Sequence, residues 1–69
     1  MGKKTKVHHP YNKFKGFLCE RGLTYRDIGN LIGITPSTVS LKINGESDFY
    51  LSEQRIIMEA YNVGSDIFC

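Results

Sequence analysis

The chain has 69 residues, a net charge of +2 and 41% hydrophobic residues. This length allows one small domain, which buries only about 60% of the surface that its unfolded chain exposes. No apolar run approaches the roughly 20 residues that cross a bilayer, and the opening residues, MGKKTKVHHP, lack the apolar region of a signal peptide. We therefore expect a cytoplasmic protein with no membrane partner.

Cysteine and histidine are too sparse for a metal or disulfide framework. Cys19 and Cys69 are the two cysteines, and we expect free thiols in a reducing compartment. No Cys or His spacing suits zinc, and His8-His9 alone is too small a cluster, so we expect no metal and no cofactor. The two histidines are expected only to add charge at low pH.

The charges are divided unevenly along the chain. Residues 1–45 carry eight basic and two acidic residues, a balance of +6, whereas residues 46–69 carry one basic and five acidic residues, a balance of −4. This asymmetry indicates one face that meets a polyanion and another that is turned away from it.

The first element follows a basic segment. Residues 1–10 are poor in hydrophobic side chains, so we expect a flexible arm, with residues 11–69 forming the single domain. Phe14, Phe17 and Leu18 fall at i, i+3 and i+4, which predicts a helix over 11–21. Gly22 is expected to end it.

A second helix is predicted over 25–32. Thr24 is its expected N-cap, with Asp27 three residues later as the capping partner. Gly33 is expected to end this helix, because a glycine tolerates the left-handed conformation of a C-terminal cap.

A third helix is predicted over 36–43. Thr35 is its expected cap, and Pro36 stands at the first helical position, where its missing N–H costs nothing. Asn44-Gly45 is expected to end the helix.

A loop and a fourth helix complete the chain. Phe49 and Leu51 of the loop are expected in the core, and Ser52 is expected to cap a helix over 52–62. A short turn, SDIF, follows at 65–68. Because no segment has the two-residue period of a strand, the predicted fold class is all-α, a compact domain of four to five helices.

The spacing of small and apolar residues over 25–43 fits two helices joined by a tight turn at about 90–120°. Counting Tyr25 as one, Gly29 stands fifth, where the second helix comes close, and Gly33 stands ninth, where a positive φ is needed. Apolar residues fill the fourth, eighth, tenth and fifteenth positions: Ile28, Ile32, Ile34 and Val39.

This pattern resembles the helix-turn-helix of the lambda-type repressor and Cro family, the Xre-like regulators. The resemblance covers about residues 14–68, and STVSLKING followed by DFYLSE looks most like small regulators of temperate phages and prophages of Gram-positive bacteria. It implies a lambda-repressor-like domain and a Cro-like repressor that binds an inverted-repeat operator as a dimer. Two positions depart from the family: Tyr25 replaces a common Gln, and Lys42 replaces an apolar residue.

The resemblance also implies which residues touch DNA. A recognition helix reads base edges in the major groove with its N-terminal residues. The expected base contacts are Pro36, Ser37, Thr38, Ser40 and Leu41. Their hydroxyls donate or accept hydrogen bonds, and the apolar groups pack on thymine methyls.

Phosphate contacts are expected where helix ends flank the groove. These residues are Thr24, Tyr25, Arg26, Lys42 and Asn44. We expect Lys42 to lay its stem on the surface and to turn its ammonium outward. The basic arm residues, Lys3, Lys4 and Lys6, are expected either to follow the DNA backbone or enter a minor groove, or to remain solvated.

The sequence is also consistent with one function other than DNA binding. The alternative is a modulator or antirepressor that engages a partner repressor through the same scaffold, because base-reading chemistry is modest and the C-terminal part is acidic. Ile56, Ala60 and Phe68 are expected either to form a face for a dimer or partner or to cover the core. No enzyme is expected, because no nucleophile–base pair, Gly-rich phosphate loop or carboxylate pair is present.

Overall fold

A computed structural model describes residues 6–68 of the chain. This part contains four α-helices, one turn of 3-10 helix and no strand: α1 (Asn12–Arg21), α2 (Tyr25–Ile32), α3 (Pro36–Asn44), α4 (Leu51–Tyr61) and η1 (Ser65–Phe68). The prediction of a compact all-α domain is confirmed. No helix within residues 6–68 is long and apolar enough to cross a membrane.

Local capping explains where α2 and α3 begin. The Thr24 hydroxyl accepts the Asp27 N–H at 3.2 Å, and the Asp27 carboxylate accepts the Thr24 N–H at 2.8 Å. The Thr35 hydroxyl accepts the Thr38 N–H at 3.2 Å. Both predicted caps are confirmed. Left-handed glycines end the first three helices, with φ of 66° at Gly22, 80° at Gly33 and 98° at Gly45.

The start of α4 differs from the prediction. The helix begins at Leu51, and the Glu53 carboxylate accepts the Tyr50 N–H at 3.0 Å, so Ser52 is not its cap. Leu51 is 71% exposed, although Phe49 is buried as expected. The predictions for Ser52 and Leu51 were therefore wrong, because Glu53 reaches back over the residue that precedes the helix.

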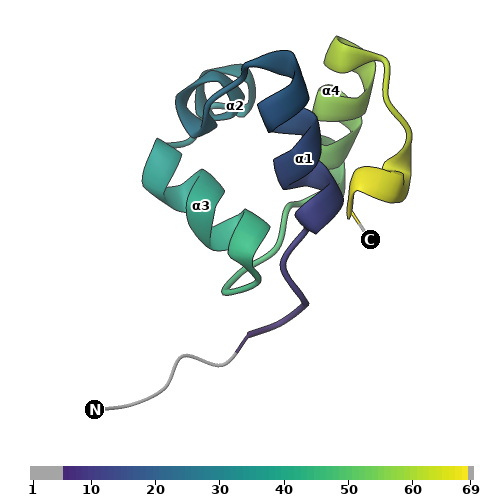
Figure 1. Ribbon diagram of the computed structural model, residues 1–69. Helices are drawn as coiled ribbons and strands as arrows, with labels where there is room; N and C mark the ends of the chain where they lie inside the picture. Colours follow the sequence, from purple (N-terminus) through teal and green to yellow (C-terminus); the bar gives the residue numbers. More distant parts are fainter. Residues whose placement is uncertain (1–5, 69) are drawn as a thin grey trace.

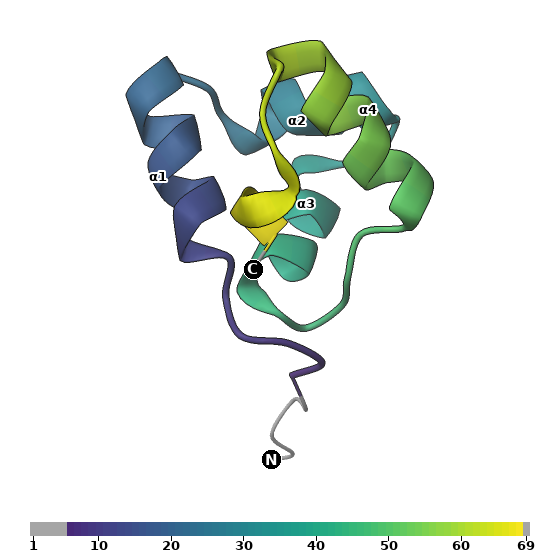
Figure 2. The ribbon, with the colours of Figure 1, turned by 90° about the vertical axis from the view of Figure 1, so that its right-hand side faces the viewer.

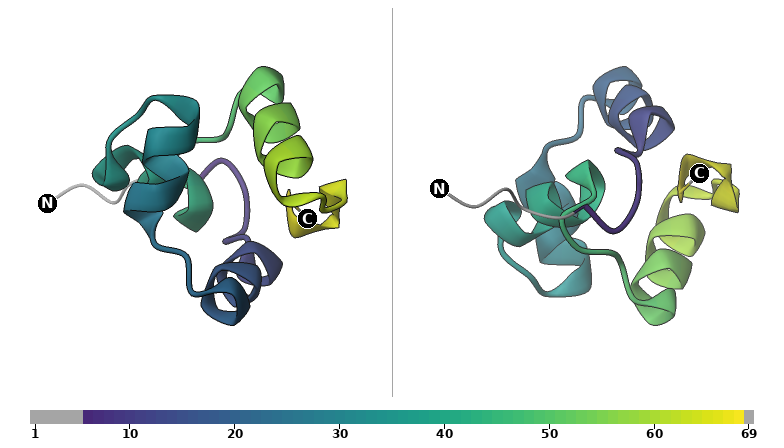
Figure 3. Two further views of the ribbon diagram at one scale, coloured as in Figure 1. Left: turned by 90° about the horizontal axis from the view of Figure 1, so that it is seen from above. Right: turned by 90° about the horizontal axis from the view of Figure 1, so that it is seen from below.

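The helices surround a single core (Figure 3). α2 packs on both α3 and α4, and η1 packs on α1 and α4. In Figure 1, α3 lies on the opposite side of the molecule from α4 and η1. The turned view in Figure 2 shows η1 between α1 and α4. One side of α3 thus lies away from the other helices.

Aromatic rings fill the centre of the core. Phe14 is fully buried, and its ring centroid lies 5.3 Å from that of Phe68 and 5.7 Å from that of Phe49. Every element contributes to the buried hydrophobic set, which comprises Tyr11, Phe14, Phe17, Leu18, Ile28, Val39, Ile43, Phe49, Ile57 and Ile67. These contacts hold the short helices together, since helices of this length are marginal on their own.

Candidate nucleic-acid interface

The corner between α2 and α3 is built around two glycines. The carbonyl oxygen of Gly29 accepts the N–H of Gly33 at 2.7 Å and that of Ile34 at 2.9 Å. A Cβ on Gly29 would overlap the Ile34 carbonyl oxygen. The need for a small residue at position 29 is confirmed. However, the close approach is to the backbone of the turn rather than to the second helix.

The first turn of α2 presents a polar end to solvent. Thr24 and Arg26 are exposed, and Tyr25 is half-buried against the core. Thr24 uses its hydroxyl within the capping box, where it also donates to Asp27 at 3.0 Å. The backbone N–H groups at this helix start carry the positive end of the helix dipole, which favours a nearby anion.

The exposed face of α3 carries short polar side chains. Val39 and Ile43 are fully buried, which turns the opposite side of the helix outward. On that outward side Pro36 and Ser37 are exposed, and Leu41 is 38% exposed. These three side chains are therefore accessible on one side of α3.

Two of the expected base contacts already make internal hydrogen bonds. The hydroxyls of Thr38 and Thr35 lie 2.9 Å apart. The Asn44 amide donates to the Ser40 backbone oxygen at 2.9 Å and to the Ser40 hydroxyl at 3.2 Å. Thr38, Ser40 and Asn44 are half-buried. A hydroxyl keeps further donor and acceptor capacity after one bond, so these contacts orient Thr38 and Ser40 without exhausting them.

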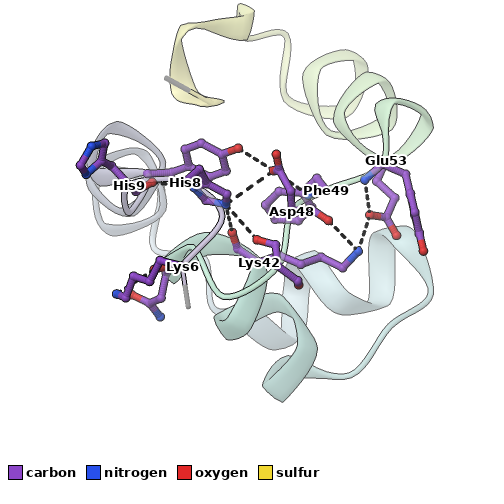
Figure 4. A network of polar contacts seen from close by, with 11 residues as sticks. Lys6, His8, His9, Lys42, Asp48, Phe49 and Glu53 are labelled. Atoms are coloured by element: carbon purple, nitrogen blue, oxygen red, sulfur yellow. Dashed lines mark hydrogen bonds and ion pairs between the residues drawn. The ribbon is translucent and has the colours of Figure 1, made fainter. Parts of the chain in front are cut away.

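Lys42 contradicts the prediction made for it. Its side chain is buried at 8% exposure, and its ammonium donates to the Glu53 carboxylate at 3.0 Å and to the Asp48 backbone oxygen at 3.2 Å (Figure 4). The ammonium points inward, between α3 and the start of α4, because a carboxylate and a carbonyl oxygen compensate it there. Lys42 therefore presents no outward cation.

The segment before α1 lies against the C-terminal end of α3. The Lys6 ammonium donates to the Asn44 backbone oxygen at 3.0 Å. His8, which sequence reasoning expected only to add charge at low pH, donates from Nε2 to the backbone oxygens of Lys42 and Ser47, each at 2.9 Å. Its partners lie more than 30 positions away, so no local pattern could have found them. Lys3 and Lys4 lie outside the described residues.

The expected dimer or partner face is not a single surface. Ile56 is 42% exposed and Ala60 is also exposed on α4. Phe68 instead packs edge-on against Phe14 and Tyr11, with ring centroids at 5.3 and 5.7 Å. Its ring belongs to the core edge, and only Ile56 and Ala60 remain as an exposed apolar pair.

Residues 6–68 contain no group of three or more His, Cys, Asp or Glu side chains that could hold a metal ion. Comparison of the chain with protein-family models, curated proteins and solved structures returned no match.

Proposed function

We propose that this chain is a sequence-specific DNA-binding transcription regulator that places α3 in the major groove. The observation that carries the proposal is the outward face of α3, where Ser37 and Leu41 lie opposite the buried Val39 and Ile43. The close approach of α2 to the turn before α3 at Gly29 supports it, because a helix-turn-helix needs a rigid corner. In this proposal the four helices and η1 form a lambda-repressor-like domain.

Base reading comes from the N-terminal half of α3. Ser37, Thr38 and Ser40 offer hydroxyls that donate to or accept from base edges, and Leu41 packs on a thymine methyl. Because Arg, Gln and exposed Asn are absent from this face, each base contact discriminates modestly. Pro36 contacts the bases or sugars nearest the start of the helix.

Phosphate contacts come from the start of α2 and from the C-terminal end of α3. Thr24 and Arg26 are exposed at the helix start, and the Tyr25 hydroxyl is the third polar group there. Lys42 leaves this set, since its ammonium is bound inside the protein. Asn44 remains among the phosphate contacts, but only through the polar groups of its amide that do not bind Ser40.

The resemblance to Cro-like regulators extends the proposal to the assembly. The chain acts as a homodimer on an inverted-repeat operator, in the cytoplasm of a bacterium that carries a phage or prophage, and represses transcription there. Among the exposed apolar residues of α4, Ile56 and Ala60 are the pair proposed for the dimer.

Selection from a random duplex library tests this function, with affinities of the winners measured at two salt concentrations. We expect an inverted repeat with half-sites about 34 Å apart. The selected site should bind at least ~10³-fold more tightly than random duplex. With about four phosphate contacts in each domain, the slope of log K against log salt should be near −4 per bound domain and about twice that for the dimer. Weak, equal binding to every duplex would contradict the proposal.

A specific observation favours a second candidate, a modulator that binds a partner repressor. The single charged side chain of α3, Lys42, is buried, whereas Tyr50 and Leu51 are each 71% exposed beside it. Aromatic and apolar side chains of this kind suit a protein interface better than a phosphate backbone. In the same selection, this candidate predicts no enriched site. It also predicts that Leu51→Ser weakens binding to the repressor.

A further inference from the structure

Four consecutive backbone oxygens at the C-terminal end of α3 accept hydrogen bonds from the segment just before α1. We call this segment, residues 6–11, the strap. The pairs are Lys42 O with His8 Nε2 at 2.9 Å, Ile43 O with the Tyr11 N–H at 2.9 Å, Asn44 O with Lys6 Nζ at 3.0 Å and Gly45 O with the Val7 N–H at 2.6 Å. The last four carbonyls of a helix have no partner within it. The strap therefore caps α3 from a segment more than 30 residues away.

The strap fits closely against α3. Gly45 is buried with φ of 98°, and a Cβ there would overlap the His8 carbonyl oxygen. The His8 ring stacks on Tyr11, with centroids 4.0 Å apart and planes at 15°. The Tyr11 hydroxyl donates to the Asp48 carboxylate at 2.6 Å, which joins the strap to the loop after α3 (Figure 4).

The same end of α3 is also held from its other side. Lys42 donates to Glu53 at the start of α4 and to the Asp48 backbone oxygen in the loop before it. α3 has only nine residues. Its N-terminal end is set by the Thr35 cap and the corner at Gly29, whereas its C-terminal end is set by the strap and Lys42.

We propose that His8 is a positioning residue for DNA recognition, which fixes the tilt of α3 by capping its C-terminal end. This inference rests on the proposed function. Base contacts tolerate only small displacements of a recognition helix, because hydrogen bonds weaken steeply as their distance and angle depart from the optimum. Release of the strap leaves the C-terminal end of α3 held only through Lys42. DNA affinity then falls while the core formed by α1, α2, α4 and η1 persists.

Two substitutions at His8 separate its hydrogen bonds from its packing. His8→Phe keeps an aromatic ring over Tyr11 but removes the donor to the two carbonyl oxygens. His8→Gln loses the ring but supplies an amide with two N–H groups for the same oxygens. His9→Phe is the matched control, because its side chain is exposed in the neighbouring position.

The first measurement needs no DNA. Amide hydrogen exchange by NMR reports the strap at the Tyr11 N–H and the end of α3 at the Glu46 N–H, which donates to Leu41 O at 3.0 Å. In His8→Phe both amides should exchange about tenfold faster, the factor expected when the one N–H shared by two carbonyl oxygens is lost. Amides of α1 should not change, and His8→Gln should restore protection. Unchanged exchange in His8→Phe would overturn the proposal.

The second measurement is affinity for the selected duplex, at a temperature where circular dichroism shows each variant folded. We expect His8→Phe to lose about tenfold in affinity, with His8→Gln and His9→Phe within about threefold of the parent. A faster-exchanging strap with unchanged affinity would overturn the positioning role. If the parent chain binds no duplex, both the proposed function and the positioning role fail. Amide hydrogen exchange still shows in that case whether the strap holds α3.

A glycine pair provides an independent test of the strap. Gly45→Ala forces a side chain toward the His8 carbonyl, whereas Gly22→Ala introduces a left-handed alanine into open space at the end of α1. Gly45→Ala should lower affinity, and Gly22→Ala should lower only stability. The double variant Gly45→Ala/His8→Phe should bind DNA no worse than the single variant of lower affinity, because both substitutions release the same strap. Additive losses would contradict a shared mechanism.

Discussion

At the residue scale, Lys42 and Glu53 form an ion pair between the end of α3 and the start of α4. The side chains are 8% and 11% exposed, and Nζ lies 3.0 Å from Oε1. The same carboxylate oxygen accepts the Tyr50 N–H, and the ammonium lies 4.5 Å from the centre of the Tyr50 ring. Each charge is compensated only as long as the other is present.

Removal of one partner should therefore cost more than removal of both. We expect Lys42→Ala to lower the free energy of unfolding by about 3–5 kcal/mol, because it leaves the Glu53 carboxylate buried without its cation. The double variant Lys42→Met/Glu53→Gln should lose less, since no charge is left inside. Urea denaturation measures both, with Lys13→Ala on the exposed side of α1 as the control. A loss below about 1 kcal/mol for Lys42→Ala would contradict this account.

The environment of Lys42 could not be predicted from its own neighbourhood. Its position on α3 allowed either an outward ammonium or a buried one, because a lysine stem reaches both places. The choice depends on Glu53 and the Asp48 carbonyl, which lie 11 and 6 positions later and meet Lys42 only when the loop folds back.

At the scale of the elements, the same substitution has opposite effects in two helices. Gly29 of α2 has no room for a Cβ, because the Ile34 carbonyl occupies that space, whereas Gly16 of α1 is exposed with nothing within 4 Å. Gly29→Ala should destabilise the fold by about 1–3 kcal/mol. Gly16→Ala should stabilise it by about 0.5–1 kcal/mol, since it removes the entropic cost of a helical glycine.

Thermal unfolding of the two variants checks this pair. Gly29→Ala should lower the melting temperature, and Gly16→Ala should raise it. A neutral Gly29→Ala would mean that α2 and the turn before α3 can move apart at no cost, contrary to a rigid corner there.

At the scale of the whole molecule, the uneven distribution of charge along the chain only partly becomes an uneven distribution between the faces of the folded protein. Arg26 lies exposed at the start of α2, but Lys42 is bound to Glu53 inside the protein. The +6 balance of residues 1–45 thus overstates the number of cations available to DNA near α3.

Arg26→Ala tests the share of binding that depends on phosphates. We expect it to weaken binding to all duplexes alike and to reduce the magnitude of the salt slope by about 0.9, the value for one lost phosphate contact. Arg55→Ala is the control, because this exposed arginine lies on α4, outside the residues proposed to contact DNA. A change in base preference for Arg26→Ala would place this residue in the groove instead.

The sequence by itself determined the number and kind of the helices, most of their ends, and the outward residues at the start of α3. These features depend on periodicity, caps and glycines within a few positions of each other, such as Thr24 with Asp27. Only the tertiary structure decided that Lys42 turns inward, that Leu51 is exposed and that His8 caps α3. Each of these depends on a partner or a packing surface brought close by folding, which local propensity does not encode.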